Sequence, residues 1–262
     1  MGNTKAPATS GTYLYCIVPA SSLAGKRRRS TAPSLGQGGA AVRIVTCDDL
    51  AAVVSDTPAG CCEVSRENLL AHEHVVEEVL SRTDVLPARF GTVAESDTAI
   101  CERLLRPRRD DLHAELARVR GCVELTLMAL WERERLFAEI VGEDNQIRTL
   151  RDEIAALPDA ASYFQRITLG QLTDAAIHMR REREADALLA AIEPPARETR
   201  QNRIFTDMMI LNVALLVPRE RVAAFDTLVS ALRRQYAGRL VFRYAGPLPP
   251  YNFVAITPSE EE

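Results

Sequence analysis

The chain has 262 residues, of which 47% are hydrophobic and 26% are charged, and its formal net charge is -4 at pH 7. This length allows one large domain or two modest ones with substantial cores, and we expect two. The composition is typical of a globular protein, and the slightly acidic balance gives no reason to expect nucleic acid as a partner.

No stretch approaches the roughly 18 uninterrupted apolar residues that a membrane-spanning helix needs. The first residues, MGNTKAPATSGTYLYCIV, lack a basic region followed by a long apolar one. We therefore expect no membrane segment and a cytoplasmic protein.

Six cysteines stand at positions 16, 47, 61, 62, 101 and 122. No two of them show the two-residue gap with which paired thiolates hold zinc. We expect all six to be reduced and to pack as small hydrophobic residues.

The first elements in the chain are strand-like. GTYLYCIVPA predicts a strand of about six residues, and residues 21–41, which are Gly, Ser, Ala and Arg without an apolar period, predict a long mobile loop. Two β-branched runs, 42–45 and 52–54, are separated by Asp48 and Asp49 and predict a hairpin.

A helical region follows the hairpin. Ser65 is a plausible N-cap, and Leu69, Val76 and Leu80 would form the apolar face of the helix behind it. After the short extended piece VLPARFGTV, a second amphipathic region breaks at Pro107 and predicts two helices.

The second half opens with CVELTLMALW, whose alternation predicts a strand with Val123, Leu125, Leu127 and Ala129 on its buried face. From Glu132 to about Ile192 the pattern is helical, with a break at LPDAAS.

The last seventy residues predict two strands, ETRQNRIF and MMILNVALLVP, then a helix and a final strand that ends at Tyr244. A strand, a helical insert, two strands, a helix and a strand make a split βαβ order, as in ferredoxin-like domains. We expect an α+β protein with an N-terminal domain at 1–121 and a C-terminal ferredoxin-like domain at 122–262. The C-terminal domain would carry its helical insert at 132–195 and end in a proline-rich strap at 246–254.

No catalytic motif stands out. His72, Glu73, His74, Glu77 and Glu78 crowd one helix, but His72 and His74 would point about 200° apart, so a solvated helix face is the favoured reading. Glycines near residue 38 precede a strand instead of a helix, which excludes a phosphate cradle. We expect no metal, no cofactor and no enzyme activity.

Basic residues cluster in two places, at Lys26 to Arg29 and at Arg106, Arg108 and Arg109. They could touch an acidic partner, but without interleaved aromatic residues a solubilising role is favoured.

Two rigid apolar segments remain, VLPARFG at 85–91 and GPLPPYNF at 246–253. They would either contact a partner or plug a junction between the domains. The candidate residues are Arg89, Phe90, Pro247, Pro249, Pro250, Tyr251 and Phe253. The prolines would fix an extended path, Tyr251 and Phe253 would anchor it, and Arg89 could pair with a carboxylate or with backbone carbonyls.

At these residues the chain resembles the gas vesicle accessory proteins GvpF and GvpL. The resemblance runs through YLYCIV, VLPARFGTV, GCVELTLMALW, ITLGQL, MILNVALLVP and YAGPLPPYNFV. The family commonly has Trp at the position of Leu248, Ser at that of Asn252 and a larger apolar residue at that of Ala88.

The resemblance implies two α+β domains, the second a modified ferredoxin fold with a variable insert. It also implies a non-enzymatic role in gas vesicle assembly: a minor vesicle component that binds the small hydrophobic shell protein, GvpA, and limits its aggregation during nucleation. Other accessory proteins of the vesicle are further expected partners.

Two alternatives stay open. Ferredoxin-like sheets often pair into small-molecule regulatory domains, so a ligand-sensing module is the first. The second is a hydrolase or metalloenzyme that uses the cluster from His72 to Glu78.

Overall fold

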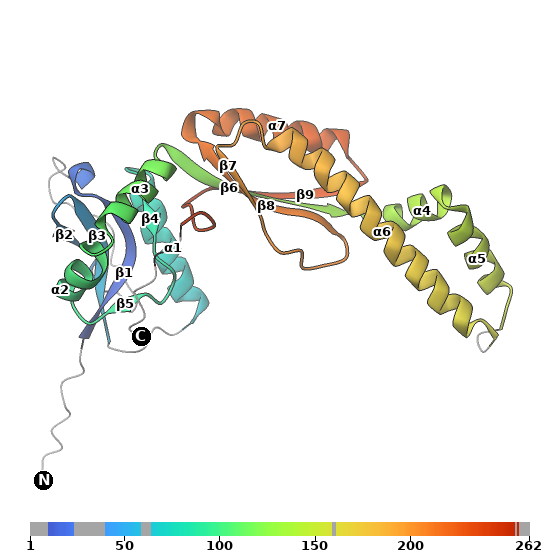
Figure 1. Cartoon of the computed structure of the whole chain (residues 1–262), viewed down its shortest axis with the longest axis horizontal. Coiled ribbons are helices and arrows are strands. Elements are labelled where there is room, and N and C mark those ends of the chain that lie inside the picture. The colour runs from blue at the N-terminus through green and yellow to red at the C-terminus, as the bar shows by residue number, and fades with distance from the viewer. Residues whose placement is uncertain (1–9, 24–39, 59–63, 159–160, 255, 257–262) are drawn as a thin grey trace, which may run out of the picture. The chain divides into compact units, whose positions relative to one another are not determined.

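The computed structural model describes residues 10–23, 40–58, 64–158, 161–254 and 256 (Figure 1). The chain divides into two compact units. Unit 1 contains the described residues up to Glu124 and from Pro247 onward, and unit 2 runs from Leu125 to Gly246. Each unit combines helices with a β-sheet, so the protein is of the α+β class.

Unit 1 is built on a five-stranded sheet with the order β2-β3-β1-β4, in which β5 also pairs with β1. The strands are β1 (Ser10–Pro19), β2 (Arg43–Cys47), β3 (Leu50–Pro58), β4 (Leu86–Pro87) and β5 (Val93–Ala94). The helices are η1 (Ala20–Leu23), α1 (Arg66–Leu80), α2 (Asp97–Ala99), the π-helix η3 (Ile100–Leu105) and α3 (Arg109–Val119).

The predicted hairpin is confirmed as β2 and β3, which pair antiparallel from Arg43↔Val54 to Cys47↔Leu50. Asp48 adopts a positive φ of 55° in the turn, a conformation that aspartate tolerates better than most residues. Strand β1 is longer than expected because it pairs with β3 along its whole length. Most of the predicted loop at 21–41 lies outside the described residues.

Helix α1 begins as predicted, since the Ser65 hydroxyl accepts a hydrogen bond of 3.1 Å from the Asn68 backbone N–H. Its buried face is formed by His72, Val75, Val76 and Leu80. The expectation that Leu69 shares this face is wrong: Leu69 lies in the first turn and is 38% exposed. The break at Pro107 is confirmed, with η3 before it and α3 after it.

Unit 2 has a four-stranded sheet with the order β7-β8-β6-β9. Its strands are β6 (Cys122–Trp131), β7 (Glu198–Gln201), β8 (Met209–Pro218) and β9 (Leu240–Leu248). Its helices are α4 (Arg133–Glu143), α5 (Asn145–Ala155), α6 (Tyr163–Ile192), η5 (Arg219–Arg221) and α7 (Val222–Gln235). The first residues of β6 and the last two of β9 belong to unit 1.

The helical region between Glu132 and Ile192 is confirmed, with one further break that the sequence pattern did not predict. At this break the Asp144 carboxylate accepts hydrogen bonds from the backbone N–H groups of Gln146 and Ile147, so Asp144 caps α5. The alternation of β6 is also confirmed, except that Glu124, expected on the exposed face, is only 2% exposed.

Two predictions near the C-terminus are wrong. Of the strand expected in ETRQNRIF, only Glu198–Gln201 forms β7. The last strand does not end at Tyr244 but continues to Leu248. Pro247 is tolerated there because β9 is a terminal strand of its sheet, where a missing N–H leaves no ladder bond unmade.

The proline-rich strap, residues 246–254, also differs from expectation. The sequence assigns it to the C-terminal domain, whereas from Pro247 onward its residues group with unit 1. None of the helices in the described ranges is long and apolar enough to cross a bilayer.

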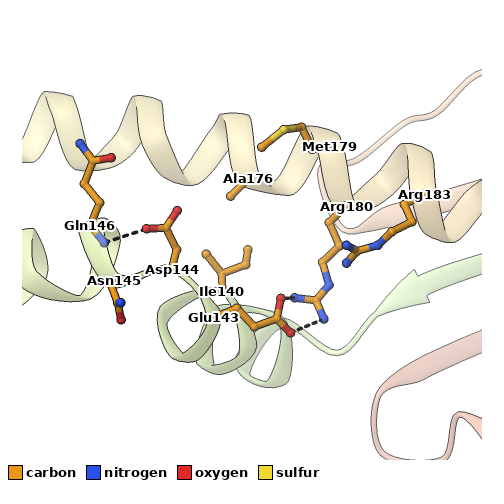
Figure 2. Close-up of a pocket in the computed structure, with 9 residues that line it drawn as sticks. All are labelled: Ile140, Glu143, Asp144, Asn145, Gln146, Ala176, Met179, Arg180 and Arg183. Carbon is orange, nitrogen blue, oxygen red and sulfur yellow. Dashed lines mark hydrogen bonds and ion pairs between the residues drawn. The ribbon is translucent and has the colours of Figure 1, made fainter.

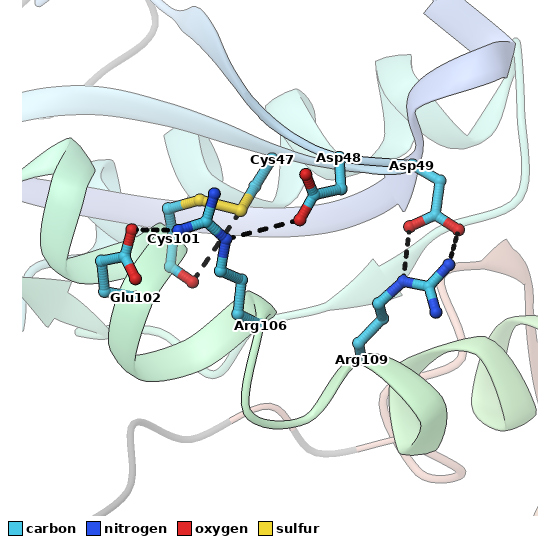
Figure 3. The surroundings of a disulfide bond; sticks show 7 residues. All are labelled: Cys47, Asp48, Asp49, Cys101, Glu102, Arg106 and Arg109. Atoms are coloured by element: carbon cyan, nitrogen blue, oxygen red, sulfur yellow. Dashed lines mark hydrogen bonds and ion pairs between the residues drawn. A yellow bond between two sulfur atoms is a disulfide. The ribbon is translucent and has the colours of Figure 1, made fainter.

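The cysteines depart from the expectation that all are reduced. Cys47 and Cys101 form a disulfide with their Cα atoms 5.7 Å apart (Figure 3). Cys16 and Cys122 are buried and do not take part in this disulfide, and Cys61 and Cys62 lie outside the described residues. The pair is 54 positions apart in the chain, so no local spacing reveals it.

Candidate functional site

The two rigid segments of the sequence meet in unit 1. On one side, β4 pairs with β1, and the Ala88 N–H donates to the Tyr15 carbonyl over 2.9 Å. On the other, Ala88 forms a parallel bridge with Ile256, and the Arg89 N–H donates to the Ile256 carbonyl over 3.3 Å. Ile256 therefore bridges to the edge of the sheet at VLPARFG.

Five rings gather beside this edge, and we call them the aromatic cluster: Tyr13, Tyr15, His72, Phe90 and Tyr251. His72 is at the centre, with its ring stacked on Tyr15 at 5.6 Å between centroids. Phe90 meets the His72 ring edge-on at 5.9 Å, and Tyr251 lies tilted at 6.3 Å. These spacings are typical of favourable aromatic pairs.

Hydrogen bonds connect His72 to β1 and to the segment after Phe90. The Gly91 N–H donates to the Tyr13 hydroxyl over 3.1 Å, and this hydroxyl shares a hydrogen bond with His72 Nδ1, 2.9 Å away. The other ring nitrogen, Nε2, is buried and has no hydrogen-bond partner among the described residues. Burial lowers the pKa of His72 to about 4, and the nearby Ala88 backbone carbonyl only partly opposes this shift. His72 is thus neutral near pH 7.

Tyr251 brings the strap into the aromatic cluster. Its side chain is half-buried, and its hydroxyl is buried with no hydrogen-bond partner in the described parts of the chain. Burial raises the pKa of Tyr251 far above its usual range, and the nearby Cys16 thiol and Glu73 carboxylate add to the shift. The phenol therefore stays protonated and acts as an apolar anchor that carries an unsatisfied polar atom.

The rest of the strap is held by backbone contacts. The carbonyl of Pro250 accepts from the N–H groups of Phe253 and Val254, at 3.0 and 2.9 Å, which closes a tight turn. Arg118 from α3 donates to the Phe253 carbonyl over 2.6 Å. Phe253 itself is 3% exposed, and Pro249 and Pro250 are buried.

The structure therefore separates the candidate residues. Phe90 and Tyr251 belong to the aromatic cluster, and Pro249, Pro250 and Phe253 are buried in unit 1. Pro247 and Arg89 are exposed, and the Arg89 guanidinium makes no hydrogen bond or ion pair with any described residue.

The histidine-rich turn of α1 does not act as a unit. His72 points into the aromatic cluster, whereas Glu73 and His74 are exposed. Within the described ranges no group of three or more His, Cys, Asp and Glu side chains is placed to hold a metal ion. The sequence suggests His72 only as a weak metal candidate. Its hydrogen bond with Tyr13 joins residues 59 positions apart, so no local pattern reveals it.

Unit 2 contains a pocket of about 430 Å³ beside a buried arginine (Figure 2). Arg180 of α6 is 7% exposed and pairs with Glu139, Glu143 and Glu184. Arg239 pairs with Glu139 and Glu184. Arg180 is thus charge-compensated, and the exposed Arg183 also lines this pocket.

The pairing of Arg180 with Glu184 has helical i, i+4 spacing, so this part of the network has a local sequence signal. The basic residues Arg106 and Arg109, read as solubilising, instead form ion pairs with Asp48 and Asp49 of the hairpin turn.

Comparison with known proteins agrees with the motifs. Residues 11–255 match the family model described as gas vesicle synthesis protein GvpL/GvpF. Gas vesicle protein F of Streptomyces sp. (strain CB03234) is 30% identical over 93% of this chain and 99% of its own length. Gas vesicle protein L1 of Halobacterium salinarum is 26% identical over 96% of this chain and 92% of its own length.

Solved structures are similar over nearly the whole chain. The crystal structure of GvpF from Anabaena sp. PCC7120 is 25% identical, with a TM-score of 0.81 over 95% of this chain and 99% of that one. GvpF from Microcystis aeruginosa is 26% identical, with a TM-score of 0.75 over 93% and 98%. This chain belongs to the gas vesicle synthesis protein GvpL/GvpF family.

Proposed function

We propose that this protein is a non-enzymatic gas vesicle assembly factor that works in the cytoplasm and becomes a minor vesicle component. It binds the small hydrophobic shell protein, GvpA, and limits its aggregation during nucleation. Other accessory proteins of the vesicle are further partners. The family membership supports the gas vesicle role, and the surface of unit 1 suggests how a client would be held.

The observation that carries the proposal is the pairing of Ala88 and Arg89 with Ile256 at the edge of the unit 1 sheet. There one apolar residue, Ile256, bridges to the edge of the sheet in the parallel direction. A shell subunit that must build a β-rich wall exposes strand edges and apolar surface of the same kind before assembly. A sheet that accepts one such segment is suited to accept another by strand addition.

The other end of this sheet is the place we assign to the client. Strand β2 is terminal in the order β2-β3-β1-β4, and Ile44 on it is 51% exposed. Cys47 and Leu50 flank a two-residue turn, and in hairpins of this kind the two flanking residues exchange hydrogen bonds. By alternation, the N–H groups of Ile44 and Thr46 point to the edge of β2 that pairs with no other described strand. These groups would pair with a client strand.

We also propose that unit 2 is a modified ferredoxin-like domain with α4 to α6 as its variable insert. Its strands occur in the chain order β6, β7, β8, β9, and the sheet order β7-β8-β6-β9 places the first and third at the centre. This arrangement supports a split βαβ plan with one helical crossover replaced by three helices.

Co-expression with the shell protein tests the proposal. The wild-type protein should keep the shell protein in the soluble fraction and co-purify with it. Thr46→Pro removes one outward N–H of β2 and should reduce the recovered shell protein at least tenfold, whereas Thr46→Val, which keeps the N–H, should not. Equal recovery with both variants would contradict strand addition at β2.

The strap is tested in the same assay. Tyr251→Ala and Phe253→Ala should lower recovery only if the strap, besides packing unit 1, shapes the client surface. Phe164→Ala is the matched control, because Phe164 is an aromatic residue of unit 2 that is 78% exposed. Circular dichroism and thermal melts must first show that each variant is folded. If no shell protein co-purifies with the folded wild-type protein, the chaperone role is wrong.

A further inference from the structure

The turn between β2 and β3 is fastened to the η3–α3 segment by one covalent bond and a few charged contacts. Cys47 is the last residue of β2 and Cys101 is the second residue of η3, and their disulfide joins the two elements (Figure 3). Beside it, Asp48 pairs with Arg106 at 3.4 Å and Asp49 with Arg109 at 2.6 Å.

The ion pairs are weak fasteners compared with the disulfide. The side chains of Asp48, Arg106, Asp49 and Arg109 are 44–57% exposed. Exposed pairs of this kind contribute little to stability because water and salt screen them. A disulfide that closes a loop of this length contributes several times more. How firmly the turn is held therefore depends mainly on whether the two sulfurs are bonded.

The two cysteines of the disulfide differ in solvent exposure. Cys47 is 5% exposed, whereas Cys101 is half-buried. Cys101 also lies in a π-helical turn, in which the Arg106 N–H donates to the Cys101 carbonyl over 3.0 Å. Such turns often occur at functional positions in helices. An attacking thiolate would reach Cys101 first and release Cys47 as the leaving thiolate.

The remaining described cysteines do not compete for this exchange. Cys16 and Cys122 are both buried, and burial raises the pKa of the Cys16 thiol well above its usual range. A thiol that stays protonated is a poor nucleophile in exchange reactions.

We propose that Cys47 and Cys101 form a reversible thiol–disulfide switch that fastens and releases the β2–β3 turn. In the closing direction, one cysteine thiolate attacks a glutathione-class disulfide and expels one thiolate. The second cysteine then attacks the mixed disulfide and expels the other, so the two cysteines are oxidised and the small disulfide is reduced to two thiols. In the opening direction a thioredoxin-class dithiol is oxidised and both cysteines regain their protons.

Helix α3 contacts both the β2–β3 turn and the strap, so opening the disulfide should also affect the strap. Its first residue, Arg109, pairs with Asp49 of the turn, and near its other end Arg118 donates to the Phe253 carbonyl. The turn held by the disulfide and the strap are thus contacts of the same helix. Opening the disulfide should loosen η3 and the end of β2 first, and the strap to a smaller extent.

The test uses the full-length protein, oxidised with oxidised glutathione and then treated with thioredoxin and its reductant under native conditions. Peptide mapping without reduction should find Cys47 linked to Cys101 in the oxidised sample and both alkylated in the treated one. Reduction should lower the Tm by about 5 to 15 °C. It should also increase hydrogen exchange in Arg43–Cys47 and Ile100–Leu105 more than in the Cys122–Trp131 strand.

Cys47→Ser serves as the matched control, because its Tm should equal that of the reduced wild type and should not respond to thioredoxin. Should this variant fail to fold, the wild-type samples alone still decide the question. Two results would overturn the switch: free Cys47 and Cys101 after oxidation, or a disulfide that thioredoxin cannot reduce in the folded protein. Neither readout involves the shell protein, so failure here is distinct from failure of the proposed function.

Discussion

Glu124 and Asn252 are joined by two hydrogen bonds although 128 positions separate them in the chain. The Asn252 backbone N–H donates to Glu124 over 2.8 Å, and its side-chain amide donates to the other carboxylate oxygen over 2.5 Å. Glu124 is 2% exposed, so its carboxylate depends on such donors for solvation. The contact fastens the strap to the start of β6, and Asn252 stands where the family commonly has Ser.

This contact predicts that Asn252→Ala lowers the free energy of unfolding by about 1 to 3 kcal/mol, because it removes one hydrogen-bond donor from a buried carboxylate. Asn252→Ser should cost less, since a hydroxyl can replace the amide donor. Urea denaturation measures both. The matched control is Asn145→Ala, at an exposed amide in unit 2. Equal stability of Asn252→Ala and the wild type would show that the contact is not formed in solution.

Two substitutions of Tyr251 should have different effects on stability. Tyr251→Phe removes a buried hydroxyl that has no partner and should leave stability unchanged or raise it slightly. Tyr251→Ala removes the ring from the aromatic cluster and should cost about 2 to 4 kcal/mol. Thermal and urea unfolding distinguish the two. A large loss with Tyr251→Phe would show that the hydroxyl has a hydrogen-bond partner in solution.

Because His72 is buried and neutral, we expect the stability of unit 1 to fall in acid. In the unfolded chain it binds a proton near pH 6.5, whereas in the folded protein burial lowers its pKa to about 4. Between these values the unfolded state binds more protons, so the free energy of unfolding falls as the pH falls. The full loss is on the order of 3 kcal/mol.

The control for this prediction is His72→Gln, whose amide does not titrate but can still accept from Tyr13. Urea melts of both proteins from pH 7.5 to 4 should show a steeper decline for the wild type. The difference isolates His72 from the exposed carboxylates Glu73 and Glu77 on the same helix. Parallel curves for the two proteins would rule out a buried neutral His72.

Among the substitutions considered in unit 2, we expect the replacement of Arg180 to lower stability most. Arg180→Met keeps much of the side chain's volume but leaves Glu139 and Glu184 with fewer cationic partners in a partly buried site. We expect a loss of about 3 kcal/mol in the free energy of unfolding. Arg183→Met, at an exposed arginine of the same helix, should change it by less than about 0.5 kcal/mol. Similar values for both variants would show that the network is not formed.

The lowered pKa of Glu139 adds a pH dependence to the same network. Burial raises this pKa, but hydrogen bonding and charge from Arg239 and the charge of Arg180 outweigh it. The carboxylate therefore contributes stability above its unfolded pKa near 4.5, and this contribution is lost as the pH falls further. In urea melts at different pH values, Glu139→Gln should remove the part of the acid dependence that comes from Glu139.

Local signals in the sequence predicted much of the fold. The Ser65 cap, the break at Pro107 and the alternation of β6 each depend on residues within one element, so a window of a few turns contains the information. Contacts such as Cys47 with Cys101 or Tyr13 with His72 join elements far apart in the chain, and only the topology of the sheet brings them together.

The candidate site likewise combines local signals with contacts that the sequence does not reveal. The composition of VLPARFG and GPLPPYNF was enough to single out both segments, because prolines and aromatic residues are unusual on a solvated surface. Their ring partners on β1 and α1 carried no such signal, since Tyr13 and His72 fit ordinary strand and helix patterns. The strap's place in unit 1 was missed because sequence order placed it after the last strand of the other unit.

Since unit 2 is inserted between two parts of unit 1, the order of synthesis matters for folding. All of unit 2 is synthesised before Tyr251, Phe253 and Ile256, although unit 1 began first. The aromatic cluster of unit 1 therefore stays incomplete until the last part of that unit has been made. Until then the edge at Ala88 is unpaired, and a protein truncated at Gly246 would keep it so permanently.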